Sequence, residues 1–194
     1  MLSNRLQQLA NYLEDPICFA DIGSDHAYLP CYVCVQHPKA KAIAGELNEG
    51  PYQRAKQTVL DQHLAAQIDV RKGNGLEVIS PGEVNQITIA GMGGKLICSI
   101  LNNGKNKLSG VQRLILQPNI DAHLVRKWVI DNSYRITAEA IILEEGYVYE
   151  IIVCDFYTKQ QKLNNQQLLF GPFLLEEKTD VFQQKWLSEK NKTT

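Results

Sequence analysis

Long apolar runs, a strong charge of either sign and an even set of cysteines are all missing from this sequence. No segment approaches the roughly 18 to 20 consecutive apolar residues that a membrane-spanning helix needs, and the N-terminus has no hydrophobic signal core. We therefore expect a cytoplasmic protein without a membrane partner. With 194 residues, 44% of them hydrophobic, the chain can bury one sizeable core.

The near absence of net charge bears on the class of substrate. The formal net charge is −1 at pH 7, whereas proteins that bind nucleic acid usually carry a basic excess that neutralises phosphates. Charge alone thus favours a small-molecule substrate. Any surface for nucleic acid must be a local patch.

Five cysteines are an odd number, and their spacing does not complete a metal site. Two residues separate Cys31 from Cys34, and His37 follows, which at first resembles part of a metal cluster. No second pair of ligands accompanies them, and a helix is expected at these positions. We interpret these cysteines as buried thiols and expect no metal site.

Apolar runs with strand character alternate with amphipathic stretches, which is typical of βαβ units around a parallel sheet. Strands are expected at residues 17–22, 40–46, 68–71, 84–90 and 113–117. Helices are expected between them, at residues 27–36, 50–63, 95–101 and 121–132. The sequence therefore predicts an α/β fold with a doubly wound sheet.

The pattern changes after residue 132. Two further strands are expected at 136–143 and 147–156, and the three residues between them are too few for a crossover helix. They must pair as an antiparallel hairpin, which gives seven strands in a mostly parallel sheet. A doubly wound sheet that ends in such a hairpin is typical of methyltransferases, whereas dinucleotide dehydrogenases have sheets that are parallel throughout.

The domain boundary is expected near residue 158. Residues 1–158 would form the domain, and residues 159–194 a C-terminal helical extension, in which the spacing of apolar residues predicts one amphipathic helix at about 171–191. We expect a monomer rather than a stable oligomer.

The first strand runs into a loop, Asp21 to His26, where Gly23 lets the backbone approach a ligand closely. Glu46 ends the second strand, where an acidic side chain can accept both hydrogen bonds from a ribose. The full G-x-G-x-x-G fingerprint of pyrophosphate sites is absent, which favours a nucleoside ligand such as S-adenosylmethionine. Alternatively, Asp21 and Asp25 cap a helix and Glu46 is a surface charge.

Three other strand ends carry candidate residues. Asn74 and Gly75 could contact adenine or form a simple turn. The glycine-rich segment 90–94 is not a phosphate loop, because its glycine spacing differs and Leu96 stands where a hydroxyl residue is needed. The amides of residues 117–119 could hold a base, although Asn119 could equally order its loop. His26 could line the ligand site or simply cap or pack against a helix.

Six segments together resemble the TrmK family of bacterial tRNA methyltransferases. They are DIGSDHAYLP at 21–30, AGE at 44–46, GPYQRA at 50–55, AGMGG at 90–94, LILQPN at 114–119 and YEIIV at 149–153. The resemblance covers residues 2–155 in the expected order, and the first, fourth and fifth segments are far more specific than a general methyltransferase motif.

The resemblance implies a Rossmann-like class I fold and methyl transfer from S-adenosylmethionine to N1 of adenine 22 in tRNA. The expected cofactor-binding residues are Asp21, Gly23, Ser24, Asp25, His26, Glu46, Leu47, Asn74, Gly75, Ala90 and Gly91. The catalytic pocket is expected to contain Asp25, His26, Met92 and Asn119. Substrate contacts are expected from Arg5, Tyr28, Gln117, Pro118 and Asn119.

Adenine N1 carries an available lone pair, so we expect direct in-line attack on the sulfonium methyl without a strong general base. Members of the family also carry a C-terminal coiled coil that is thought to grip tRNA, of which only the first helix is expected in this sequence. Two other classes stay open at this point. A small-molecule methyltransferase would suit the balanced charge, and a nicotinamide-binding regulator would need glycines that the loop lacks.

Overall fold

The computed structural model of this chain describes residues 2–159 and 161–192. The strands are β1 (Cys18–Ile22), β2 (Lys41–Glu46), β3 (Ile68–Lys72), β4 (Gln86–Met92), β5 (Arg113–Pro118), β6 (Tyr134–Glu144) and β7 (Tyr147–Phe156). The helices are α1 (Asn4–Asn11), α2 (Tyr28–Gln36), α3 (Glu49–Asp61), α4 (Gly94–Asn103), α5 (Ala122–Asp131), α6 (Asn165–Phe170), α7 (Pro172–Glu177) and α8 (Asp180–Lys192), with short 3₁₀ turns η1 (Gly75–Val78) and η2 (Lys105–Lys107).

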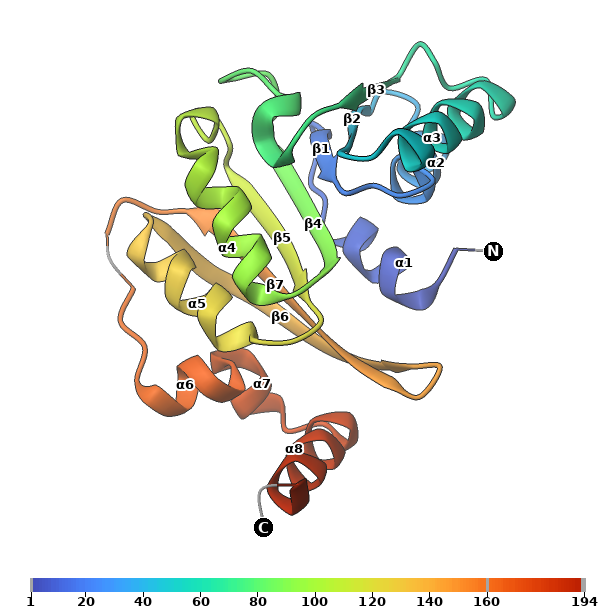
Figure 1. Ribbon diagram of the computed structural model, residues 1–194. Coiled ribbons are helices and arrows are strands. Elements are labelled where there is room, and N and C mark those ends of the chain that lie inside the picture. Colours follow the sequence, from blue (N-terminus) through green and yellow to red (C-terminus); the bar gives the residue numbers. More distant parts are fainter. Residues whose placement is uncertain (1, 160, 193–194) are drawn as a thin grey trace.

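The seven strands form one sheet in the order β3-β2-β1-β4-β5-β7-β6 (Figure 1). The strands from β3 to β5 run parallel, and β7 is antiparallel to both β5 and β6. The predicted doubly wound sheet with a terminal hairpin is therefore confirmed. The bounds of the predicted strands lie within two residues of the observed ones.

Helices cover both faces of the sheet, which is why its strands read as nearly continuous apolar runs. On one face, α1, α2 and α3 bury a cluster that includes Leu9, Phe19 and Val59. On the other face, α4 and α5 bury a cluster that includes Ile89, Leu101 and Val125. The two layers fix the central strands and leave their ends to carry the functional loops.

The β6–β7 hairpin is closed by a two-residue turn. Glu145 and Gly146 have φ values of +50° and +82°, as a type I′ turn requires at both central positions. The hairpin is long and extends past α1 toward the C-terminal helices (Figure 1). It therefore reaches the edge of the sheet where the parallel strands end.

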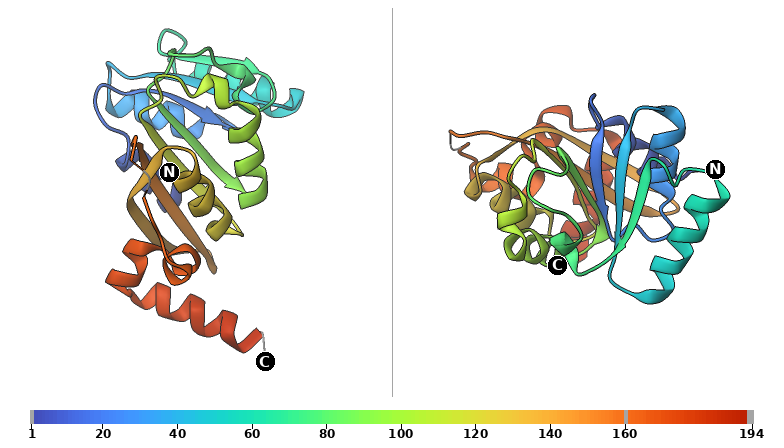
Figure 2. Two further views of the ribbon diagram at one scale, coloured as in Figure 1. Left: turned by 90° about the vertical axis from the view of Figure 1, so that its left-hand side faces the viewer. Right: turned by 90° about the horizontal axis from the view of Figure 1, so that it is seen from above.

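The prediction of one C-terminal helix at about 171–191 is wrong. Two helices, α7 and α8, occupy this part of the chain, and a third, α6, directly precedes it; all three lie beyond one end of the sheet (Figures 1 and 2). Gly171 has φ +91° and precedes Pro172, the first residue of α7, while Lys178 has φ +47° and ends that helix. Residues 160, 193 and 194 of the expected extension lie outside the described residues.

Candidate active site

The candidate site lies where β1, β2, β4 and β5 end. Because these strands are parallel, their carboxyl ends meet at one edge of the sheet. The chain order reverses between β1 and β4, and such a switch point opens a crevice in doubly wound sheets. Most of the predicted site residues stand in the loops that leave this edge.

Asp21 near the end of β1 is held by two hydroxyl groups. The Ser24 hydroxyl donates to one carboxylate oxygen and the Thr88 hydroxyl to the other, both at 2.6 Å. The side chain is 5% exposed, and burial raises the pKa of Asp21 although both hydrogen bonds oppose the shift. This carboxylate orders the loop at 21–26 and caps no helix, because α2 begins after Ala27 without a side-chain cap bond.

Glu46 closes the same loop from the neighbouring strand. Its carboxylate accepts a hydrogen bond from the backbone N–H of Asp25. It is only 6% exposed, and burial raises the pKa of Glu46 against that hydrogen bond. The alternative interpretation of Glu46 as a surface charge is therefore wrong. Asp25 itself is solvent-exposed and has φ +52°, which turns the chain toward α2.

Two glycines allow close approaches at this edge. Gly23 has φ +73°, and a Cβ at this position would stand 2.3 Å from the Met92 methyl carbon. A Cβ on Gly94 would stand 2.4 Å from the carbonyl oxygen of Asp121. The loop after β1 thus lies directly against the end of β4, and α4 begins directly against the loop before α5.

The end of β5 carries a buried amide with several partners. Gln117 has no exposed surface. Its Oε1 accepts from Arg5 Nη1 at 2.7 Å and from the backbone N–H of Gly91 at 3.0 Å. Its Nε2 donates to Asn119 Oδ1 at 3.0 Å. The structure therefore joins Arg5, Gly91 and Asn119, three predicted site residues from distant segments, through a fourth.

The other predicted residues surround this centre. The His26 ring stacks on Tyr28, with ring centroids 5.0 Å apart. Pro118 is buried as the last residue of β5, and Ala90 is partly buried near the end of β4. Leu47 follows Glu46 and is 56% exposed.

The loop after β3 lies beside the end of β2. The Gly73 N–H donates to the Glu46 carbonyl at 2.8 Å, and Asn74 follows as an exposed residue. Asn74 precedes η1, and a Cβ on Gly75 would stand 2.9 Å from Ile100. The turn therefore packs on α4 while Asn74 faces outward at the site edge.

Three residues at the site were missed by sequence reasoning. Thr88 holds Asp21, Glu144 accepts from the backbone N–H of Asn4 at 2.6 Å, and the Tyr149 ring lies 5.2 Å from the Arg5 guanidinium. A threonine between isoleucines in a buried strand was the one available signal, since such a polar group needs a partner. Nothing local marks Glu144 or Tyr149.

The cysteines near α2 lie away from this edge. Cys31 and Cys34 are buried, and burial raises the pKa of each thiol to about 11. Within residues 2–159 and 161–192, no group of three or more His, Cys, Asp or Glu could hold a metal ion.

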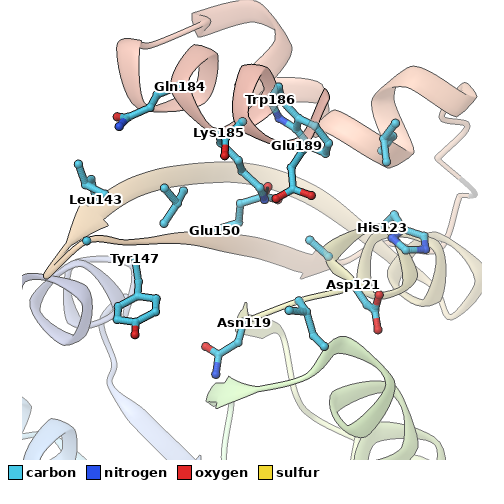
Figure 3. A pocket seen from close by; sticks show the side chains of 16 residues that line it. Asn119, Asp121, His123, Leu143, Tyr147, Glu150, Gln184, Lys185, Trp186 and Glu189 are labelled. Atoms are coloured by element: carbon cyan, nitrogen blue, oxygen red, sulfur yellow. Dashed lines mark hydrogen bonds and ion pairs between the residues drawn. The ribbon is translucent and has the colours of Figure 1, made fainter. Parts of the chain in front are cut away.

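A cavity of about 580 Å³ opens beside Asn119. Figure 3 shows Asn119 from the end of β5 and Tyr147 from the hairpin on one side, with Lys185 and Trp186 of α8 on the opposite side. The side chain of Glu150 lies between them and pairs with Lys185. The cavity adjoins the crevice and is bordered by the C-terminal helices.

Comparison with known proteins identifies relatives of this chain. The family model TrmK, described as tRNA (adenine(22)-N(1))-methyltransferase, matches residues 19–194. A tRNA (adenine(22)-N(1))-methyltransferase of Bacillus subtilis (strain 168) is 48% identical over 192 residues, which are 97% of this chain and 81% of the relative.

Two solved structures share the fold. The crystal structure of the B. subtilis m1A22 tRNA methyltransferase TrmK has a TM-score of 0.93 at 46% identity, over 100% of this chain and 84% of that one. The structure of M. capricolum TrmK in complex with S-adenosyl-homocysteine has a TM-score of 0.78 at 32% identity, over 88% and 76%. The Rossmann-like methyltransferase fold is thus confirmed, and the chain belongs to the TrmK family of tRNA (adenine(22)-N(1))-methyltransferases.

Proposed function

We propose that this chain transfers a methyl group from S-adenosylmethionine to N1 of adenine 22 in tRNA. The observation that carries the proposal is the pair of buried carboxylates, Asp21 and Glu46, that hold a close-packed glycine loop at the switch point of the sheet. The B. subtilis relative, 48% identical, is named for this activity.

The sheet edge suits a cationic nucleoside. Asp21 and Glu46 each use hydrogen bonds to order the loop, and their carboxylate oxygens have further lone pairs that can accept from a ligand. Glu46 at the end of β2 is placed to accept from ribose hydroxyls. Asp21 supplies negative charge near a sulfonium and an ammonium group. A nicotinamide dinucleotide also needs close backbone contacts to its pyrophosphate, and the loop has Asp25 and Tyr28 where the G-x-G-x-x-G fingerprint has its second and third glycines, which argues against that ligand.

When bound, S-adenosylmethionine supplies an electrophilic methyl group. No side chain has to remove a proton from adenine N1, because this nitrogen carries a lone pair in the neutral base. The residues at the edge therefore act by positioning: Met92 packs against the glycine loop, and Asn119 stands at the mouth of the cavity. The new bond joins N1 to the methyl carbon as the bond from that carbon to sulfur breaks.

The cavity beside Asn119 gives room for a nucleotide that has been turned out of the folded tRNA. Its volume of about 580 Å³ is within the range of small-molecule sites. Tyr147 is 69% exposed and borders it, and so offers an aromatic face to a base.

Labelled methyl transfer tests the activity. The protein is incubated with S-adenosylmethionine labelled in the methyl group and with tRNA transcripts that carry adenine or guanine at position 22. We expect label only in the adenine transcript. Equal labelling of both transcripts, or labelling of neither, would contradict the proposal.

Calorimetry with S-adenosylhomocysteine tests the residue roles. Asp21→Ala and Glu46→Ala should abolish binding, whereas Asn119→Ala should bind normally and transfer methyl groups slowly. Asp61→Ala on the exposed end of α3 removes an acidic residue outside the site and is the matched control. Unchanged affinity in both carboxylate variants would show that the site is assigned wrongly.

We also propose that the enzyme acts in the cytoplasm as a monomer, in agreement with a tRNA substrate. Among residues 2–159 and 161–192, no helix is long and apolar enough to cross a bilayer. Sedimentation at micromolar concentration should give the mass of one 21.9 kDa chain. A dimer mass would contradict the monomer.

A further inference from the structure

The orientation of the Gln117 side-chain amide is fixed by its surroundings. Both groups that face its Oε1, the Arg5 guanidinium and the Gly91 N–H, are donors and cannot accept. The atom between them must therefore be the oxygen. Consequently the Gln117 nitrogen must face Asn119, at 3.0 Å.

This orientation passes to Asn119. The group that receives the Gln117 N–H must be an acceptor, so Asn119 Oδ1 faces inward and its Nδ2 faces outward. The backbone of Asn119 is also fixed, because its N–H donates to the Met92 carbonyl at 2.8 Å. Asn119 is exposed and lines the cavity. The chain thus presents a hydrogen-bond donor to whatever occupies that cavity.

Arg5 is held in place from two sides. Glu144 accepts from the backbone N–H of Asn4 at 2.6 Å and of Arg5 at 3.4 Å, which anchors the start of α1 to the hairpin. The Arg5 guanidinium lies over the ring of Tyr149, 5.2 Å from its centroid. The guanidinium therefore has a defined position facing inward to Gln117, which does not suit the predicted role of Arg5 as a direct substrate contact.

We propose that Arg5 is a positioning residue that acts through Gln117 to fix the Asn119 amide, so that Asn119 donates its Nδ2 hydrogen bond to the nucleotide being methylated. This inference rests on the proposed function. Adenine N1 must keep its lone pair for the methyl group, so the donor binds a different acceptor of the same nucleotide, a ring nitrogen such as N3 or N7 or a ribose oxygen. Asn119 thus orients the base while leaving its nucleophile free.

Two isosteric variants separate this relay from simple packing. Asn119→Asp keeps the oxygen that faces Gln117 and removes the outward donor. Gln117→Glu keeps an acceptor for Arg5 and Gly91 and adds a negative charge opposite Arg5. It also places an oxygen opposite Asn119 Oδ1, so the Asn119 amide must rotate to present its nitrogen instead. We expect kcat for tRNA to fall by about tenfold to a hundredfold in each, with S-adenosylhomocysteine affinity within about twofold of wild type.

Arg5→Met should lower kcat by no more than about tenfold, and by less than Gln117→Glu does, because the Gly91 N–H still holds Gln117. Arg135→Met is the matched control. It removes an arginine from the start of β6, at the opposite end of the strands from the candidate site, where Arg135 is the register partner of Asp155 on β7. It should keep wild-type kcat. Wild-type kcat in Asn119→Asp or Gln117→Glu would overturn the relay, as would an Arg5→Met enzyme that loses cofactor affinity instead of kcat.

A readout independent of activity comes from the Gln117 side-chain amide in a ¹⁵N spectrum. Its Nε2 protons should exchange slowly in wild type and faster in Arg5→Met, and rapid exchange in wild type would overturn the relay. Failure of the proposed function has a different signature, namely that wild-type protein methylates no tRNA while this amide is still protected.

Discussion

The guanidinium of Arg126 on α5 lies 2.7 Å from the carboxylate of Glu139 on β6, and neither side chain has any exposed surface. Arg126 also contacts Glu150 on β7 at 2.5 Å, and Lys185 of α8 pairs with Glu150 from the other side. Burial alone would lower the pKa of Arg126, but the two carboxylates outweigh it and the pKa is raised. The two positive charges and the two negative charges of this cluster therefore neutralise one another.

This cluster fastens the C-terminal helices to the sheet. Arg126 Nη1 donates to the carbonyl oxygens of Leu168 and Leu169 on α6, each at 3.2 Å. The N–H of Phe173 on α7 donates to Glu139 at 3.0 Å. The position of α6, α7 and α8 beside the cavity thus depends on charges that a change of one residue would leave unpaired.

Arg126→Met should destabilise the fold by about 3 to 5 kcal/mol, because it leaves buried carboxylates without their main partner. Chemical unfolding at pH 7 measures the loss. Lys127→Met is the matched control from the next position of α5, where Lys127 makes an exposed pair with Asp131 at 3.2 Å. It should cost no more than about 0.5 kcal/mol. Equal effects of the two variants would contradict a stabilising role for the buried cluster.

The sheet could be predicted well because its strands and its hairpin turn are determined by residues that are close together in the sequence. The runs that became β1, β4 and β5 are apolar on both sides, and the tight turn at Glu145 and Gly146 forces a hairpin. The site edge follows directly from this topology, since parallel strands all end on one side. Asp21, Glu46 and Gln117 could therefore be placed at a common edge from sequence alone.

Tertiary partners could not be predicted in the same way. Arg126 stands in a helix next to Lys127, and sequence offers no reason why one is buried and the other solvated. The pairing of Arg5 with Gln117 joins residues 112 positions apart. The break between α7 and α8 was missed because the residue that ends α7 with φ +47° is Lys178, and neither a glycine nor a proline marks this position.

Gly23→Ala and Gly82→Ala separate the cost of backbone strain from the effect of a contact between the loop at 21–26 and Met92. Both glycines have positive φ, +73° and +76°, so alanine should cost about 1 to 2 kcal/mol of stability at either position. Only at Gly23 would the new Cβ meet another residue, Met92, and at Gly82 it meets nothing within 4 Å. Chemical unfolding measures the shared cost. S-adenosylhomocysteine affinity should fall in Gly23→Ala alone, and an equal fall in Gly82→Ala would contradict the contact.

Cys31 and Cys34 should resist alkylation in the native protein. With a pKa of about 11 for each thiol, the reactive thiolate is a fraction of roughly one in a thousand or less at pH 7.5. Iodoacetamide labelling followed by mass spectrometry should modify both residues only after unfolding in guanidinium. Rapid labelling in the native state would contradict their burial.

Asp21→Asn should raise the stability of the ligand-free protein at neutral pH while it weakens cofactor binding. Burial raises the pKa of Asp21 in the folded state, so folding favours the protonated form. The stabilisation from this group is complete below the ordinary pKa of about 3.9 and is lost as pH rises through the higher folded value. Wild type should therefore lose stability relative to Asp21→Asn across that interval.

Chemical unfolding of both proteins from pH 4 to pH 8 measures the difference in the free energy of unfolding, which should widen with pH and then level off. A difference that shrinks with rising pH would mean that the Ser24 and Thr88 hydroxyls, rather than burial, determine the ionisation of this carboxylate.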